Sequence, residues 1–147
     1  MSTGLSTIMR NGFSLLELLI VVAIILIIAT IAIPSLLRSR QAAQESSAVA
    51  QLRTINTAEN TYIGSNQGAY GDIPSLVTQG LLDARFTGSI SGYSFTIGVS
   101  GNIYTANANA ASANAGRFDF YTTADYVLRY ATDPTRAPAG LTGEPVR

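Results

Sequence analysis

Gly12-Phe13-Ser14-Leu15-Leu16-Glu17 stands directly before an apolar run, Leu18 to Leu37, that contains no charged residue. A helix rises 1.5 Å per residue, so about 20 apolar residues match the roughly 30 Å hydrocarbon core of a bilayer. The sequence therefore predicts that residues 13–37 form a helix able to span a membrane.

Glu17 is the unusual residue of this junction, because an ordinary membrane anchor carries lysine or arginine there. Buried charges persist only when they are paired. If the chain were cut between Gly12 and Phe13, Phe13 would gain an α-amine with a pKa of about 8. The amine of a neighbouring chain, displaced along a helical stack, would then pair with Glu17 and set the register. Alternatively, Glu17 lies hydrated at headgroup level, favoured by its helix N-terminus.

The segment Gly12 to Val22 closely resembles the class III signal of the type IV pilin and pseudopilin superfamily. In that family a membrane aspartyl peptidase cuts after the glycine and methylates the new N-terminal residue, and a glutamate near the new terminus assists assembly. The resemblance implies cleavage between Gly12 and Phe13, N-methylation of Phe13 and an assembly role for Glu17. It is strong from Asn11 to about Ile63 and looser beyond.

Other interpretations of the N-terminus are open. A secretory signal has a shorter apolar region and a small-residue cleavage site, for which only Thr30-Ile31-Ala32 is available. An uncut anchor is harder to exclude, because Arg10 precedes the run while Arg38 and Arg40 follow it, so charge does not set the orientation. Outward placement of the C-terminal region is implied by the resemblance alone.

Composition limits the chemistry. Nine basic and nine acidic residues give a formal net charge of zero, which argues against a nucleic-acid partner. The chain has no histidine, lysine or cysteine, so the Ser-His, Ser-Lys and Cys-His nucleophile arrangements are excluded. We expect no enzyme and no cofactor. The lack of cysteine also departs from the many pilins that carry a C-terminal disulfide loop.

The helix should continue as an amphipathic segment over residues 38–64. Its apolar stripe recurs with the helical period and comprises Ala48, Leu52, Ile55, Ala58 and Tyr62. Pro34 lacks an N–H and crowds the preceding turn, so we expect a kink or a local loss of helix at Thr30 to Pro34. Gly64 is the expected C-terminal cap.

The remainder predicts a small α+β head of the type IV pilin-like class, in which the long helix packs on a four-stranded antiparallel sheet. Residues 1–12 form a leader, 65–90 a connection with a short helix opened by Pro74 and stopped by Gly80, 91–132 the sheet, and 133–147 an extended surface tail. The expected strands are 93–99, 103–106, 117–122 and 126–130. The small-residue segment 107–116 between them reads as a mobile, exposed loop.

Three aspartates near strand ends, Asp119, Asp125 and Asp133, are weak candidates for calcium, which prefers oxygen ligands. The alternative is that they form turns and surface pairs with Arg117, Arg129 or Arg136. No other metal site is predicted.

The resemblance implies a structural subunit of a type IV pilus-like filament, a homo-oligomer stored in the inner membrane as a single-pass precursor and displayed at the cell surface when assembled. Its expected partners are the membrane, a prepilin peptidase, and an assembly platform and ATPase. A type II secretion pseudopilin is the alternative within this class. An uncut membrane-anchored binding module, and then a membrane enzyme, are the alternatives outside it.

Overall fold

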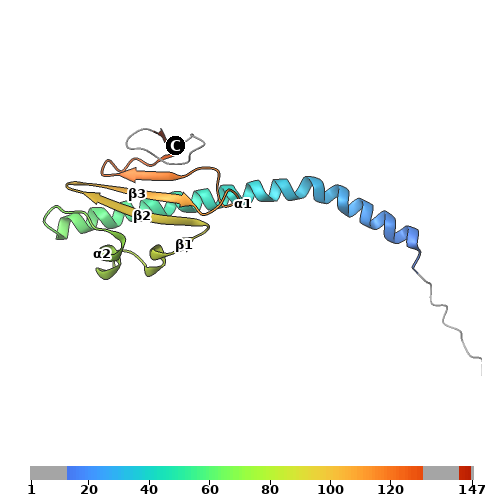
Figure 1. The fold of residues 1–147 in the computed structure, drawn as a ribbon, viewed down its shortest axis with the longest axis horizontal. Coiled ribbons are helices and arrows are strands. Elements are labelled where there is room, and N and C mark those ends of the chain that lie inside the picture. The colour runs from blue at the N-terminus through green and yellow to red at the C-terminus, as the bar shows by residue number, and fades with distance from the viewer. Residues whose placement is uncertain (1–12, 131–142, 147) are drawn as a thin grey trace, which may run out of the picture. The chain divides into compact units, whose positions relative to one another are not determined.

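The computed structural model describes residues 13–130 and 143–146 (Figure 1). The chain divides into two compact units, with the boundary between Leu36 and Leu37. The first unit holds the N-terminal half of one long helix. The second unit, the head, contains the rest of that helix, two short helices and a sheet.

Helix α1 spans Leu15–Ser65, 51 residues, which confirms the long N-terminal helix. The helix is continuous through Pro34, so the expected local loss of helix does not occur. Proline removes a single N–H donor, and the flanking turns here remain helical. A kink at Pro34 stays a prediction.

In the head, α1 buries the predicted stripe. Ala48, Leu52, Ile55 and Ala58 are each at most 4% exposed, and Tyr62 is half-buried. These residues belong to one hydrophobic core with the sheet, along which the helix lies in Figure 1. The small and branched side chains that recur at helical spacing thus form the interface between the helix and the sheet.

The C-terminal end of α1 differs from the expectation. Gly64 lies inside the helix, and the left-handed residue that follows the helix is Gln67, with φ 56°. The amide of Gly68 donates to the carbonyl of Ile63 at 3.1 Å, which is the long-range bond of a Schellman cap. The prediction that Gly64 is the cap is therefore wrong, because a non-glycine residue takes the strained position.

The predicted short helix is present as α2, Ile73–Thr78. Asp72 is its N-cap and accepts from the amide of Ser75 at 3.0 Å, while Pro74 lies in the first turn. Leu76 is fully buried, and Gly80 follows with φ +71°. A 3-10 helix, η1, Ala84–Thr87, leads into the sheet.

The sheet is antiparallel throughout and has six strands in sequence order, not the four expected. The strands are β1 Ser89–Ile90, β2 Tyr93–Ser100, β3 Ile103–Ala110, β4 Phe120–Thr123, β5 Arg129–Tyr130 and β6 Glu144–Pro145. The two additional strands, β1 and β6, have two residues each, too few for an alternating pattern to reveal them. β6 lies in the segment predicted as an extended tail.

Strand β3 runs to Ala110, so the prediction of a mobile loop over 107–116 is wrong for its first four residues. Ala106 and Ala108 are buried, whereas Asn107 and Asn109 lie on the opposite face. The low-complexity segment is in fact a period-two strand pattern, in which alanine leaves room for the closely packed helix.

The last two predicted strands are shorter than expected. β4 begins at Phe120 instead of residue 117, and β5 contains only Arg129 and Tyr130. Ser100 pairs with Ile103 across the predicted first hairpin turn, where Gly101 has φ +59°. The second predicted turn follows β4, with the amide of Tyr126 donating to the carbonyl of Thr123.

Candidate assembly site

Glu17, which the sequence predicts as the assembly residue, caps the N-terminal end of α1. Because the helix begins at Leu15, Ser14 is the N-cap, and the Ser14 amide donates to Oε2 of Glu17 at 3.0 Å. This is one half of a capping box, in which a carboxylate in the first turn satisfies an amide that has no helical partner. The Ser-x-x-Glu spacing would have revealed this local role for Glu17.

Phe13 is the first described residue, and 76% of it is exposed. Gly12, its partner in the predicted cleavage, lies outside the described residues. Cleavage between Gly12 and Phe13 and N-methylation of Phe13 therefore stay predictions. An exposed residue before a capped helix start is a geometry that a peptidase can reach.

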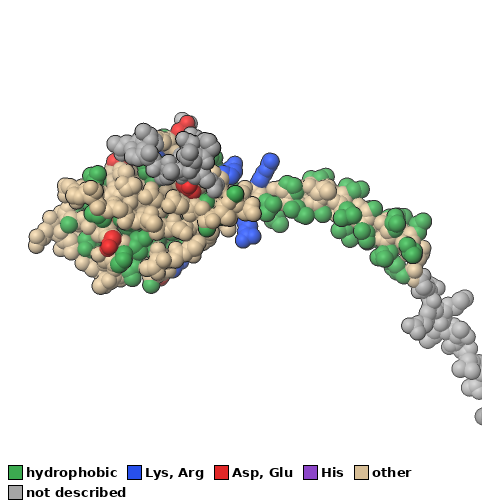
Figure 2. Space-filling model, in the orientation of Figure 1, with side chains coloured by type: hydrophobic (Ala, Val, Ile, Leu, Met, Phe, Trp, Pro, Cys, Tyr) green, Lys and Arg blue, Asp and Glu red, His purple; other side chains and the backbone are tan. Residues whose placement is uncertain are grey.

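Behind this end, the large apolar side chains of α1 from Leu15 to Leu37 are exposed. Figure 2 shows hydrophobic side chains along the face of this segment that is in view. By length and composition it is able to cross a membrane, and none of its most apolar stretch is buried within the chain. An apolar surface of this extent marks a contact with lipid or with other protein. The structure thus leaves the whole segment available for such contacts.

Buried polar groups that were not predicted from the sequence link α1 to the rest of the head. Glu45 is 8% exposed and pairs with Arg117 through Nη2 at 3.1 Å, while the Arg117 amide donates to Oε1 of Glu45 at 2.7 Å. The hydrogen bond and charge of Glu45 raise the pKa of the Arg117 guanidinium. This contact joins α1 to the segment before β4.

Further along α1, Asn56 links the helix to two strands. Its Oδ1 accepts from the hydroxyl of Tyr104 at 2.7 Å, and its Nδ2 donates to Oγ1 of Thr122 at 3.1 Å. Burial is the main cause that raises the pKa of Tyr104. A fully satisfied buried network of this kind fixes one arrangement of helix and sheet.

Glu59 is completely buried and accepts from the amide of Gly71 at 3.1 Å through Oε2. Its Oε1 has no hydrogen-bond partner among the described residues. Burial raises the pKa of Glu59, the Gly71 amide opposes that shift, and the nearby charge of Asp72 adds to it. Glu45, Asn56 and Glu59 occur at helical spacing within the core stripe, which is the signal that could have identified them.

The calcium candidates are not brought together among the described residues. Asp119 precedes β4 and Asp125 follows it, while Asp133 lies outside the described part. Asp119 accepts from the amide of Ala110 at 2.8 Å. Asp125 binds Arg129 at 2.6 Å, which is the main cause that lowers its pKa to about 2. Of the described side chains, no group of three or more suits a metal ion.

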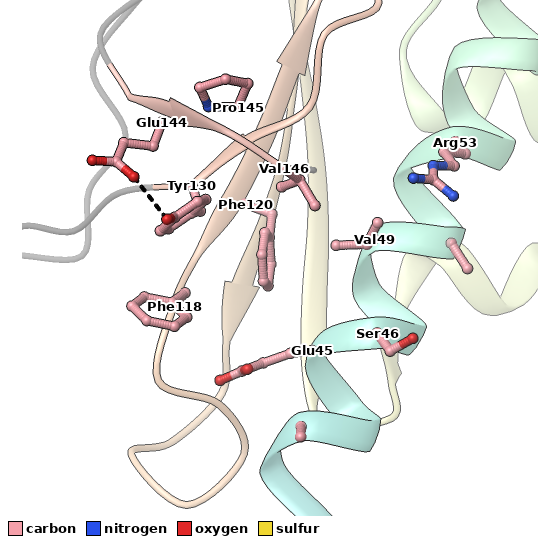
Figure 3. A pocket seen from close by; sticks show the side chains of 12 residues that line it. Glu45, Ser46, Val49, Arg53, Phe118, Phe120, Tyr130, Glu144, Pro145 and Val146 are labelled. Carbon is pink, nitrogen blue, oxygen red and sulfur yellow. Dashed lines mark hydrogen bonds between the residues drawn. The ribbon is translucent and has the colours of Figure 1, made fainter.

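A groove of about 820 Å³ lies in the head between α1 and the strands β4 to β6. Figure 3 shows Val49 of α1 facing Phe120 and Val146 across it. Two carboxylates at its edge already have partners: Glu45 binds Arg117, and Glu144 accepts from the Tyr130 hydroxyl at 2.9 Å. Arg53 also lines the groove, so its surface combines apolar side chains with charged ones.

Comparisons with known proteins agree with this arrangement. The family described as "Prokaryotic N-terminal methylation motif" matches residues 9–33. The chain is 41% identical over 68 residues to the "Type IV major pilin protein PilA" of Myxococcus xanthus, which covers 46% of the chain and 30% of that relative. It is 39% identical over 75 residues to the "Type IV wide pilus major component PilA4" of Thermus thermophilus, which covers 50% of the chain and 57% of that relative.

The chain thus spans less than two thirds of either relative. The matched motif covers the capped start of α1 and most of its exposed apolar segment, and the head adds an antiparallel sheet packed on the same helix. The chain thus carries the prokaryotic N-terminal methylation motif over residues 9–33 and is similar over about half of its length to two type IV major pilin proteins.

Proposed function

We propose that the chain is the structural subunit of a type IV pilus filament. The observation that carries this proposal is the apolar half of α1, which the chain's own fold leaves uncovered. This segment follows Glu17, whose carboxylate caps the helix inside the methylation motif. Such a segment can leave lipid only for another apolar environment, and a bundle of identical segments supplies one.

In this proposal the precursor rests in the inner membrane until a prepilin peptidase cuts between Gly12 and Phe13 and methylates Phe13. Glu17 then exchanges its local bond to the Ser14 amide for the amine of a neighbouring subunit, which sets the register. An assembly ATPase and platform move subunits from the membrane into the filament. Both relatives carry names that describe major pilus components, which favours a pilus over a secretion pseudopilin.

Mass spectrometry of the N-terminal peptide tests this function. We expect N-methylated Phe13 at the start of the chain in filaments sheared from the cell surface. The same processed peptide found only in membranes would indicate a pseudopilin or a minor subunit. An intact leader, residues 1–12, in functional cells would contradict the filament and favour an anchored binding module.

A further inference from the structure

Arginine side chains are exposed at the end of the head where α1 first contacts the sheet side of the fold. Arg38 and Arg40 directly follow the apolar run and lie within one turn of Gln41, whose side chain donates to the carbonyl of Ala113 at 2.9 Å. Figure 2 shows basic side chains, in blue, on α1 beside the head. We call this end the basal face; it comprises Arg38, Arg40, the β1–β2 turn Ser91-Gly92 and the β3–β4 connection 111–117.

Hydrogen bonds hold the segments of the basal face together. The amide of Ala111 donates to the carbonyl of Gly92 at 2.9 Å, so the two strand connections meet. The hydroxyl of Ser47 on α1 donates to that of Ser91 at 3.1 Å. Apart from Arg117, the two connections carry no charge, and none of their side chains is longer than that of asparagine. This end of the head can therefore approach a flat surface closely.

The exposed charges of the basal face are all positive. Arg38 and Arg40 are exposed and form no salt bridge with a described residue. The side chain of Arg117 is 59% exposed although it pairs with Glu45. Two carboxylates lie close to this face, but both are buried: Glu45 binds Arg117, and Asp119 accepts from a backbone amide at 2.8 Å. The exposed guanidinium groups are thus free to bind an anion from outside the described part of the chain.

We propose that the basal face binds the phosphate groups of anionic lipids and so seats the head of the precursor on the membrane surface. The apolar run ends at Leu37, so a helix that spans the bilayer places Arg38 and Arg40 at the depth of the headgroups. A guanidinium group forms bidentate hydrogen bonds with phosphate. Successive residues are about 100° apart on a helix, so the two arginines reach phosphates on different sides of α1. This inference rests on the proposed function, which keeps the precursor in the membrane.

The position of the charges identifies a membrane as the source of the phosphate. The other exposed arginine of α1, Arg53, lies about 20 Å further along the helix than Arg40. A soluble phosphate would reach both residues equally, whereas a membrane at the end of the apolar run selects Arg40, because surface charge is screened within about 8 Å in physiological salt. Each arginine near an anionic surface contributes about fivefold to the binding equilibrium. Transfer into a filament removes these phosphates and releases the basal face.

Quenching of a fluorescent label tests this contact on the full chain in nanodiscs. The chain has no cysteine, so a label can be attached at a single introduced site. Asn114→Cys places the label on the basal face, and Asn102→Cys places it in the exposed β2–β3 turn at the opposite end of the sheet. Neutral acrylamide is the quencher. The discs contain either phosphatidylcholine alone or equal amounts of phosphatidylcholine and phosphatidylglycerol.

We expect phosphatidylglycerol to protect the label at Asn114→Cys from quenching several-fold, and roughly 1 M salt, where the Debye length is about 3 Å, to remove this protection. The label at Asn102→Cys should be quenched equally in both discs. Arg40→Gln should remove part of the protection, and its combination with Arg38→Gln most of it. Arg53→Gln is the matched control, because it removes one exposed charge from the same helix, and it should retain the protection.

Equal quenching of the Asn114→Cys label in neutral and anionic discs would overturn the proposal, as would an equal loss of protection in Arg40→Gln and Arg53→Gln. Inorganic phosphate added to the neutral discs distinguishes a membrane contact from a site for a free anion, and protection by phosphate alone would also overturn it. The N-terminal peptide tests the proposed function separately. An intact leader together with lipid-dependent protection would contradict the filament but support the membrane contact.

Discussion

Glu59 is a carboxyl group enclosed by the head, and its environment makes the neutral form the favoured one. Burial raises its pKa above the ordinary 4.5, while the single bond from the Gly71 amide only partly offsets this. The folded state therefore holds the proton more tightly than the unfolded state. The free energy of unfolding should be highest below pH 4.5 with respect to this group and fall as pH rises through the raised pKa.

Glu59→Gln tests this linkage, because an amide keeps the acceptor for Gly71 and never ionises. We expect the free energy of unfolding of this variant, measured by denaturant titration in detergent, to fall less between pH 4.5 and 8 than that of the wild type. At neutral pH the variant should be at least as stable as the wild type.

Asp125→Asn is the matched control. The pKa of Asp125 is lowered to about 2, so its stabilisation is present above its ordinary 3.8 and is lost only as pH falls towards 2. This control should lower stability but keep the wild-type slope above pH 4.5. Parallel slopes for wild type and Glu59→Gln would show that Glu59 does not titrate in this window.

At the scale of elements, the backbone at the C-terminal end of α1 is strained at Gln67, and a substitution can relieve this strain. A left-handed conformation costs a non-glycine residue about 1 kcal/mol or more, and Gln67 holds φ 56°. Gln67→Gly should raise the free energy of unfolding by about 1 kcal/mol and the midpoint by a few degrees in thermal unfolding followed by circular dichroism. Gly68→Ala, at φ +85°, should do the opposite.

The segment between β3 and β4 depends on glycine for space. A Cβ at Gly116 would lie 1.8 Å from the hydroxyl oxygen of Tyr93, which is fully buried and donates to the Phe118 carbonyl at 2.7 Å. Gly116→Ala should therefore destabilise the head by roughly 1–3 kcal/mol in the same assay. Gly98→Ala in β2 meets nothing within 4 Å and should change stability little. Equal effects would exclude the clash as the cause.

The elements also show what the sequence could and could not predict. The long helix, its core stripe, α2 and the β2–β3 hairpin follow from periodicity and turn residues within single segments. β1 and β6 are too short to carry a period. β1 pairs with β2 directly after it, whereas β6 pairs with β5 across the longer segment between them. The alternation of Asn and Ala in β3 was visible but was masked by its low complexity.

The candidate site was predictable to a different extent at each end. Glu17 and the apolar run follow from charge and length alone, and the capping bond was available from the Ser-x-x-Glu spacing. Glu45 and Glu59 lie at helical spacing within the core stripe, which indicates their position, but carboxylates are expected outside unless paired, so the spacing alone does not predict their burial. The partners that justify them, Arg117 and Gly71, come from other elements and appear only in the folded chain.

For the whole molecule, the two roles of Glu17 can be separated. In the single chain its carboxylate caps α1 through the Ser14 amide, whereas in the proposed filament its charge pairs with the amine of a neighbour. Glu17→Gln keeps an oxygen that can accept from Ser14 but removes the charge. We expect the variant to accumulate in the membrane at the wild-type level, with sheared filament yield reduced at least tenfold.

Glu17→Asp gives the complementary measurement, since it keeps the charge but shortens the reach by one methylene. A register role predicts that it retains more filament than Glu17→Gln does, because a charge pair tolerates a modest change in distance better than the loss of one charge. Wild-type filament yield from Glu17→Gln would show that the carboxylate serves only as a helix cap. The register would then depend on the packing of the apolar helices alone.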